Sequence, residues 1–181
     1  MRVIAGEKRG TTLVSPPGTD IRPTYDRVRE AVFGKLQFQI QDKTVLDLFA
    51  GSGAMGIEAL SRGAAFVYFV DRDESAIQTV RANVLKTKYD EKCKIIKNDY
   101  IFALKLFKNV QKFDIVFIDP PYDSDIYKEA LELLDGNGLL NPNALVVLES
   151  GRAMDIQVEG FAQTKTKKYG KAFITYMEWG K

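Results

Sequence analysis

The sequence predicts an α/β fold in which helices cover both faces of a doubly wound, mainly parallel sheet. Between residues 44 and 150, short and almost entirely apolar segments rich in Val, Ile and Phe alternate with segments that have a helical spacing of apolar residues. Continuous apolar runs of this kind are typical of strands buried on both faces. Repeated βαβ units with right-handed crossovers assemble such strands into a parallel sheet.

The central elements can be located individually. We expect one helix after Asp73, which is a suitable N-cap, and another after Ser124, which the Gly136-Asn137-Gly138 sequence would end. The strands of this region are expected at Thr44–Phe49, Phe66–Asp71, Lys94–Lys97, Phe113–Asp119 and Ala144–Glu149.

The N-terminal segment breaks this repetition. Val3–Ala5 and Thr11–Val14 are expected to pair as an antiparallel hairpin through the glycines between them. A helix that Pro23 opens should run from Thr24 to about Leu36.

The C-terminal segment also departs from the βα repetition. Gln163–Tyr169 and Ala172–Trp179 alternate in polarity and are separated by a glycine, which predicts a closing antiparallel hairpin. No internal repeat or linker divides the chain. We therefore expect a single domain over residues 1–181, with a small extension over 1–40 and a core over 41–181.

Composition excludes several kinds of chemistry. The chain has no histidine and one cysteine, so imidazole bases are excluded and no metal site is expected. Cys93 can form no internal disulfide and is expected to be a half-buried structural thiol. The N-terminus lacks the apolar region of a secretion signal, and no stretch approaches the roughly 20 apolar residues of a membrane span. A cytoplasmic protein is therefore expected.

Positive charge is concentrated at the two ends of the chain. Residues 1–35 carry seven Arg or Lys against four Asp or Glu, and residues 165–181 carry five against one, although the net charge is only +2. A basic rim around an acidic centre suits a polyanion, because phosphates supply much of the affinity of such complexes. An unevenly charged, solvated surface explains the same distribution about equally well.

The strongest local signal is the glycine-rich segment from Asp47 to Gly56, DLFAGSGAMG. It follows a predicted strand, opens a predicted helix, and matches G-x-G-x-x-G through Gly51, Gly53 and Gly56. Such glycines let the backbone approach a ligand closely, and an acidic residue after the next strand, here Asp71, can bind both ribose hydroxyls. This predicts a nucleotide-cofactor site without choosing between NAD and S-adenosylmethionine.

Two acidic positions favour S-adenosylmethionine. Asp47 lies four residues before Gly51, where a carboxylate can bind the amino group of a methionine moiety but would repel a pyrophosphate. Asn98-Asp99 follows the third strand, where a side chain can accept a hydrogen bond from an adenine amino group. Asp99 is also a suitable N-cap for a helix over 100–108, and it could serve both roles.

A second motif, Asp119-Pro120-Pro121-Tyr122, follows the fourth strand at the edge where open α/β sheets hold ligands. Asp119 and the carbonyl of Pro120 form a rigid pair of acceptors for the two hydrogens of one NH2 group, and Tyr122 offers a flat face to a base. Two fixed acceptors favour a pyramidal nitrogen whose lone pair is aimed at a sulfonium methyl group. The motif predicts methylation of an exocyclic amine without His or Cys.

The whole chain resembles the bacterial 16S ribosomal RNA (guanine-N2)-methyltransferase family, of the small-subunit rRNA methyltransferase D type. The resemblance rests on the segments MRVIAGEKRG, RPTYDRVREAVF, VLDLFAGSGAMGIEALSRGA, FDIVFIDPPY and TKKYGKAFITY. The glycine loop and DPPY are shared with many amino-methyltransferases, whereas the stretch over residues 22–30 makes the match specific.

This resemblance implies a Rossmann-like class I S-adenosylmethionine-dependent methyltransferase fold: a seven-stranded, mostly parallel sheet with a C-terminal antiparallel hairpin and a small N-terminal hairpin-plus-helix extension. It also implies S-adenosylmethionine as methyl donor, and as acceptor the N2 of one guanine in 16S rRNA, free or within the small subunit. We expect a monomer.

The resemblance further implies roles for particular residues. The target amine would be held by the catalytic residues Asp119, Pro120 and Tyr122. The donor would be bound by Asp47, Ala50, Gly51, Ser52, Gly53, Gly56, Asp71, Asp99 and Thr24. Phosphates of the RNA are expected to contact Arg2, Lys8, Arg9, Arg22, Arg27, Lys167 and Lys168.

Two positions depart from the family pattern, and several alternatives remain. Gly34 stands where Asn is expected, and Lys171-Ala172 replaces an acidic-Thr pair.

A DNA adenine-N6 methyltransferase would also use DPPY, but the chain leaves no room for a DNA-reading module. A protein-glutamine methyltransferase would carry Asn at Asp119, an NAD-dependent dehydrogenase would leave DPPY unused, and an inactive rRNA-binding assembly factor would not need Asp47 and Asp119.

Overall fold

The computed structural model describes residues 1–16, 23–120 and 126–180, without the side chains of Pro23, Thr24 and Tyr25. The strands are β1 Thr44–Asp47, β2 Phe66–Asp71, β3 Cys93–Lys97, β4 Phe113–Ile118, β5 Leu140–Ser150, β6 Phe161–Tyr169 and β7 Ala172–Trp179. The helices are α1 Pro23–Leu36, α2 Ala54–Ser61, α3 Glu74–Thr87, α4 Tyr100–Phe107 and α5 Ile126–Gly136, with a 3₁₀ turn, η1, at Asp90–Lys92.

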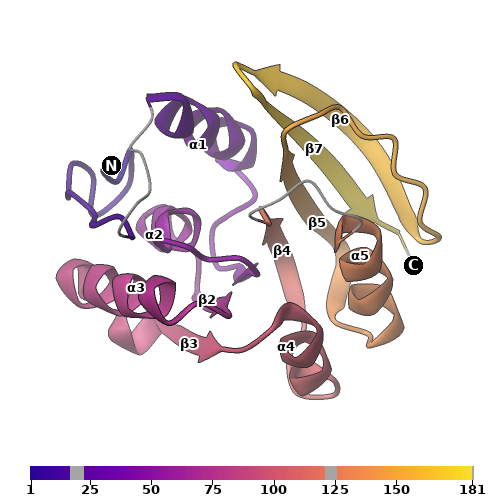
Figure 1. Ribbon diagram of the computed structural model, residues 1–181, viewed down its shortest axis with the longest axis horizontal. Coiled ribbons are helices and arrows are strands. Elements are labelled where there is room, and N and C mark those ends of the chain that lie inside the picture. The colour runs from indigo at the N-terminus through magenta and orange to yellow at the C-terminus, as the bar shows by residue number, and fades with distance from the viewer. Residues whose placement is uncertain (17–22, 121–125, 181) are drawn as a thin grey trace.

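The strands form one seven-stranded sheet in the order β3-β2-β1-β4-β5-β7-β6 (Figure 1). Strands β1 to β5 pair in parallel, and β7 pairs antiparallel with both β5 and β6. The strand order therefore reverses between β1 and β4, which is the position where doubly wound sheets bind ligands. The predicted fold class, including the closing hairpin, is confirmed.

Two hydrophobic clusters cover the two faces of the sheet. Helices α1, α2 and α3 pack with Val45, Phe69, Phe117 and Val147 on one face, which we call the α1 face. Helices α4 and α5 pack on the opposite face, with residues such as Val116. Because side chains alternate along a strand, residues two apart share a face. This alternation determines on which face of the sheet the side chain at the end of each strand lies.

Helix termini agree with the signals in the sequence. The side chain of Asp73 accepts a hydrogen bond from the Ala76 amide at 3.0 Å and caps α3, as predicted. Helix α5 ends at Gly136, and Gly138 adopts a left-handed φ of 65° just after it. Ser124, the predicted cap of α5, lies outside the described residues. Strand β5 begins four residues earlier than expected, at Leu140 rather than Ala144.

The N-terminal segment pairs with itself less extensively than predicted. Instead of two strands it forms one isolated bridge, Arg2–Thr12. The flanking backbone hydrogen bonds run from the Leu13 amide to the Met1 carbonyl at 3.0 Å, from the Val3 amide to the Thr11 carbonyl at 3.0 Å and from the Gly10 amide to the Val3 carbonyl at 2.9 Å. Several of its other polar groups are bound by α2. The amides of Ile4 and Ala5 donate to the Glu58 carboxylate at 2.7 and 3.0 Å. Contacts with the core thus replace a longer hairpin ladder.

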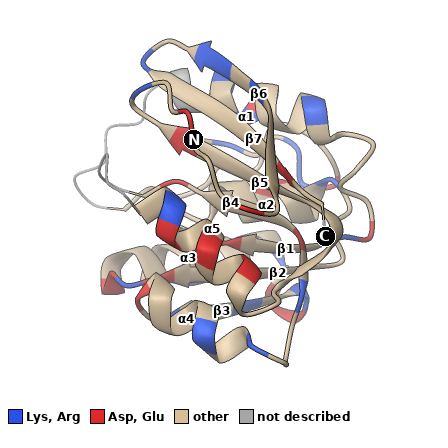
Figure 2. Ribbon diagram, turned by 90° about the vertical axis from the view of Figure 1, so that its right-hand side faces the viewer, with Lys and Arg blue, Asp and Glu red and all other residues tan. Residues whose placement is uncertain are grey.

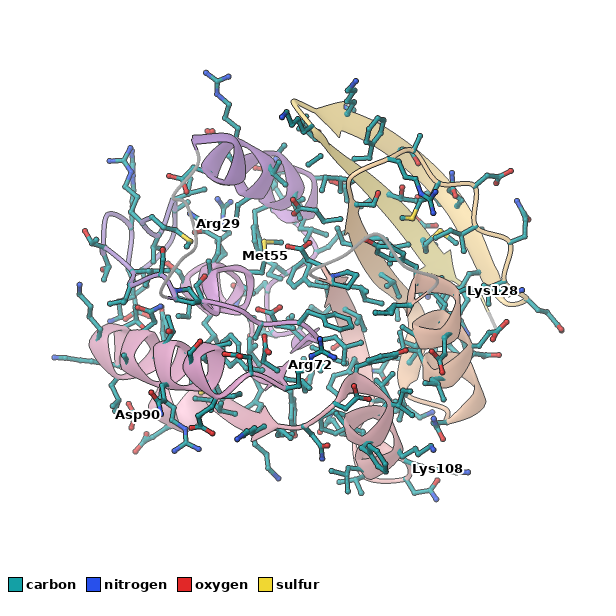
Figure 3. All side chains as sticks on the ribbon, viewed as in Figure 1. Arg29, Met55, Arg72, Asp90, Lys108 and Lys128 are labelled. Atoms are coloured by element: carbon teal, nitrogen blue, oxygen red, sulfur yellow. The ribbon has the colours of Figure 1, made fainter. Side chains whose placement is uncertain are left out.

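Glu58 is a fully buried charge whose partners converge from three segments. Arg62 Nε donates to it at 2.7 Å from the same helix, and Arg29 Nε lies 3.8 Å away on α1. Arg29 also donates to the Arg2 carbonyl and to Asp26 (Figure 3). A buried carboxylate is tolerated only when it is paired in this way. The extension over residues 1–16 is therefore an integral part of the domain.

Two further features concern the chain as a whole. Cys93 is a half-buried free thiol, as expected, and burial raises its pKa to about 11, so it remains protonated and unreactive at neutral pH. In the described part of the chain, no helix is long and apolar enough to span a bilayer.

Candidate active site

The glycine loop joins β1 to α2 and needs its glycines for different reasons. Gly51 has a left-handed φ of 54°, and a Cβ at this position would meet nothing within 4 Å, so the loop backbone borders open space. At Gly56, by contrast, a Cβ would lie 2.2 Å from Phe69 Cε1 of β2. The first glycine therefore leaves the backbone accessible to a ligand, and the third allows α2 to pack closely on the sheet.

Asp47 ends β1 beneath this loop and is buried. Its Oδ2 accepts a hydrogen bond from the Gly56 amide at 3.1 Å. Burial raises the pKa of Asp47 to about 7, the Gly56 hydrogen bond opposes this shift, and the negative charge of Asp71 adds to it. Among the described residues, no Lys or Arg pairs with Asp47. A buried carboxylate in this state would be stabilised by a cationic ligand.

Asp71 ends β2 and holds two loops at once. Its Oδ2 accepts from the Gly51 amide at 2.9 Å, and its Oδ1 accepts from the Asp73 amide at 2.9 Å. The Asn98 amide in turn donates to the Asp71 carbonyl at 3.0 Å. The turns after β1, β2 and β3 therefore meet at Asp71, and the expected role of Asp71 in binding a ribose stays a prediction.

Asp99 follows this turn and caps α4, since its side chain accepts from the Ile101 amide at 2.9 Å. The capping role that the sequence suggested is confirmed. A carboxylate oxygen retains further acceptor capacity after one such bond, so the second suggested role, binding an adenine amino group, stays a prediction.

Asp119 directly follows β4 and is accessible to solvent, whereas Pro120 behind it is buried. The neighbouring protein groups displace part of the water around this accessible carboxylate, and this effect, followed by the negative charges of Glu149 and Asp47, raises the pKa of Asp119 above its usual value. Pro121 and Tyr122 lie outside the described residues, as do Arg22 and the side chain of Thr24.

Glu149 is a site residue that sequence reasoning missed. The pairing of Ile118 with Leu148 sets Asp119 and Glu149 at adjacent positions on neighbouring strands. Burial raises the pKa of Glu149 to about 7. A signal was available, because Glu149 ends an apolar strand just as Asp47 does.

The four carboxylates share one face of the sheet. Asp47, Asp71, Asp119 and Glu149 each lie two residues beyond a member of the hydrophobic cluster on the α1 face. Together they form an acidic line across the carboxyl ends of β2, β1, β4 and β5. In the described part of the chain, no group of residues has the composition of a metal site. The arrangement suits ligands that present several hydrogen-bond donors or a positive charge.

The basic residues predicted to contact RNA are found in different settings. Lys8 Nζ pairs with Glu7 at 2.6 Å and lies 5.6 Å from the centre of the Tyr89 ring. Side chains that are exposed to solvent belong to Arg2, Arg9, Arg27, Lys167 and Lys168. The lysines of β6, which is an edge strand of the sheet, are blue in Figure 2.

Comparison with solved structures identifies the class of fold. The Escherichia coli protein YhhF superposes with a TM-score of 0.86 at 31% identity, covering 100% of this chain and 98% of that one. A Thermus thermophilus 16S rRNA N2 G1207 methyltransferase, solved with AdoMet and guanosine, shares the fold with a TM-score of 0.70 at 20% identity, over 90% of this chain and 44% of that one. Fold and site define a Rossmann-like S-adenosylmethionine-dependent methyltransferase.

The family is also shown by sequence. A family model described as conserved hypothetical protein 95 matches residues 1–178, and the chain belongs to this family. The ribosomal RNA small subunit methyltransferase D of Escherichia coli K12 is 39% identical over 150 residues, which are 83% of this chain and 74% of that protein. The protein of the same name from Haemophilus influenzae is 38% identical over 151 residues, which are 83% and 78% of the two chains.

Proposed function

We propose that this enzyme transfers a methyl group from S-adenosylmethionine to the exocyclic N2 of a guanine in 16S rRNA. The relatives named as small-subunit rRNA methyltransferases support the RNA class of the substrate. We choose guanine as the target base because Asp119 and Glu149 lie at adjacent positions at the ends of β4 and β5.

The donor fits the residues around the glycine loop. Asp47 would bind the ammonium of the methionine moiety, because its buried charge has no cationic partner among the described residues. Open space at Gly51 leaves room for the donor beside the loop backbone. Asp71 would bind the ribose hydroxyls and Asp99 the adenine. Ala50, Ser52, Gly53, Gly56 and Thr24 complete the proposed donor site.

The target amine would be held by Asp119 and the Pro120 carbonyl. S-adenosylmethionine supplies an electrophilic methyl group on a sulfonium sulfur. The two acceptors would fix both N–H bonds, so that the nitrogen lone pair points at the methyl carbon. As the new N–C bond forms, the S–C bond breaks and the amine becomes cationic and acidic. Asp119, whose pKa is already raised, then accepts the released proton and passes it to water.

Glu149 would select guanine. The N2 amino group of guanine is flanked by the N1–H donor, so two adjacent carboxylates match two adjacent donors on this edge. Adenine presents a lone pair at N1 beside its amino group, which an ionised carboxylate repels. A carboxylate accepts and does not donate when ionised, so Asp119 and Glu149 together favour guanine over adenine.

Methyl transfer from an isotopically labelled donor tests this proposal. Purified enzyme would be incubated with 16S rRNA, with small subunits and with adenine-rich DNA, followed by nucleoside analysis by mass spectrometry. We expect N2-methylguanosine from the RNA substrates and no labelled adenine from DNA. Glu149→Gln should lower guanine transfer, whereas Glu132→Gln, on the exposed side of α5, should not. N6-methyladenine as product, or no transfer to any substrate, would refute the proposal.

A further inference from the structure

Three lysines from two distant segments gather at the α1–β6 edge of the sheet, and we call Lys35, Lys165 and Lys167 the lysine cluster. Lys35 of α1 lies with its Nζ 3.8 Å from the centre of the Tyr176 ring of β7. Tyr176 pairs with Lys165 of β6, and the neighbouring Ile174 pairs with Lys167. The cluster is thus formed around one aromatic side chain, by α1 and by the edge strand.

The charges of this cluster oppose one another. Burial lowers the pKa of Lys35, and Lys165 and Lys167 lower it further, while Glu178 acts in the opposite direction. Neither Lys165 nor Lys167 forms an ion pair with a described residue. Like charges held close together without enough counter-charge are unfavourable, and a bound anion would relieve this repulsion.

The register of the sheet aligns this cluster with the proposed active site. Lys167 pairs with Ile174, and Ile174 pairs with Glu149, which is adjacent to Asp119. These positions form one row across β4, β5, β7 and β6. Three interstrand spacings of about 4.8 Å separate the backbone at Asp119 from that at Lys167 by about 14 Å. This separation is within reach of the phosphates that flank a flipped-out base.

The cluster also lies on the same face of the sheet as the catalytic carboxylates. Ile174 and Tyr176, the partners of Lys167 and Lys165, belong to the hydrophobic cluster on the α1 face. Lys168 pairs with Phe173 and lies over its ring, with Nζ 5.3 Å from the centre, on the opposite face. Two neighbouring lysines that the sequence grouped together are therefore separated by the sheet.

We infer that the lysine cluster binds the phosphates of the RNA strand that flank the target base, and that Lys168 has no part in this contact. The inference rests on the proposed function, because the row begins at the residues that would hold the guanine. A phosphodiester strand supplies the regularly spaced negative charge that the three lysines lack. The lysines of β6 all lie in its second half, where the ribbon is blue in Figure 2.

Paired variants test the inference. Lys165→Ala/Lys167→Ala removes two charges of the cluster, and Lys35→Met removes the third while keeping an apolar stem on the Tyr176 ring. Lys168→Ala is the matched control, since it removes the same charge from the same strand on the other face. Affinity for 16S rRNA would be measured by filter binding over a series of KCl concentrations. Calorimetric titration with S-adenosylmethionine and thermal unfolding would show that the donor site and the fold are intact.

Each lost phosphate contact should reduce the slope of log affinity against log salt by about 0.7 for a single strand. The double variant should therefore lose about 1.4 units of slope and about tenfold in affinity at low salt, while Lys168→Ala matches wild type. Donor affinity should be the same in all variants. Equal effects of Lys168→Ala and the double variant, or no effect of either, would overturn the inference.

The outcome also separates this inference from the proposed function. If the double variant binds RNA normally and wild type makes N2-methylguanosine, the function stands and the RNA path lies elsewhere. If wild type transfers no methyl group to RNA, the proposed function fails whatever the lysines bind. If wild type binds polyglutamate as tightly as RNA, and the double variant loses both, the cluster is a site for acidic polypeptides and the inference is wrong.

Discussion

The Gly51 amide donates a hydrogen bond to Asp71 Oδ2 at 2.9 Å, and this bond ties the glycine loop after β1 to the end of β2. The same carboxylate accepts from the Asp73 amide, which begins the turn into α3. Asp71 thus organises two of the loops that would surround a donor before any ligand contacts it. Its removal should therefore affect both the direct contact and the shape of the site.

Asp71→Ala should weaken the binding of S-adenosylmethionine by about 1–3 kcal/mol, which is the usual loss for a charged hydrogen-bond partner. Asp71→Asn keeps an acceptor for the Gly51 amide and should lose less. Isothermal titration calorimetry with S-adenosylmethionine, its demethylated product and NAD measures these differences, and NAD should not bind. Glu132→Gln serves as a surface control. Tight NAD binding, or an unchanged affinity in Asp71→Ala, would contradict this assignment.

Asp47 should destabilise the ligand-free protein at alkaline pH. Its folded-state pKa of about 7 lies above the ordinary aspartate value of 3.8, so between these values the folded state binds the proton more tightly than the unfolded state. The contribution of Asp47 to stability is therefore fully present below about pH 4 and is lost as pH rises through about 7. Asp47→Asn, which keeps an acceptor for Gly56, should match wild type near pH 4 and exceed it at pH 8 by on the order of 2–4 kcal/mol.

Urea denaturation of ligand-free wild type and Asp47→Asn at the two pH values measures this difference. Donor binding by the variant should be strongly reduced, since the amide has no charge for the ammonium of the donor. An Asp47→Asn variant that is less stable than wild type at pH 8 would mean that a cation already neutralises this carboxylate.

The sequence predicted those parts of the site that local signals determine. The acidic residues that end strands, the glycine loop and the Asp73 cap all follow from short patterns, and the structure has them where expected. Glu149 could not be assigned a role in this way, because its proximity to Asp119 depends on the register of β4 with β5. The separation of Lys167 from Lys168 likewise depends on which face of β6 meets α1.

Long-range polar contacts explain why the N-terminal prediction was less accurate. The Asn83 side chain on α3 is buried, accepts from the Val14 amide at 2.7 Å, and donates to the carbonyls of Val14 and Ser52 at 2.9 Å. Glu58 binds the amides of Ile4 and Ala5 in a similar way. The N-terminal partners of Asn83 and Glu58 lie more than 50 residues away from them in sequence, so no local pattern could indicate these contacts.

Asp119→Ala should abolish methyl transfer and leave donor binding nearly unchanged, because Asp119 is proposed to contact only the acceptor amine. Tyr122→Ala should raise KM and lower kcat, with a loss of about 1–3 kcal/mol from base stacking. Single-turnover transfer to 16S rRNA and donor calorimetry separate the two effects. Wild-type turnover by Asp119→Ala would show that the amine is held elsewhere.

The pH dependence of methyl transfer should follow the ionisation of Asp119 and Glu149. The pKa of Glu149 is raised to about 7 by burial, and the pKa of Asp119 is raised by the partial loss of its surrounding water and by the charges of Glu149 and Asp47. Both groups must be ionised to accept N–H bonds from guanine, so the single-turnover rate should rise with pH through a range that includes the Glu149 pKa of about 7. Because the ionisation of each carboxylate depends on that of the other, the midpoint of the pH–rate profile describes the pair and cannot be assigned to one residue.

Glu149→Gln tests this coupling directly. Loss of the Glu149 charge lowers the pKa of Asp119, so the acidic limb of the profile should move to lower pH even though the maximal rate falls. Discrimination against adenine should also weaken, because the glutamine amide of the variant can donate a hydrogen bond to adenine N1. In wild type, only a protonated Glu149 could donate this bond, at a pH below about 7. Rates with guanine- and adenine-containing oligoribonucleotides between about pH 5.5 and about pH 9, on both sides of the Glu149 pKa of about 7, measure both effects. An acidic limb that does not move, with discrimination unchanged, would mean that Glu149 neither interacts with Asp119 nor contacts the base.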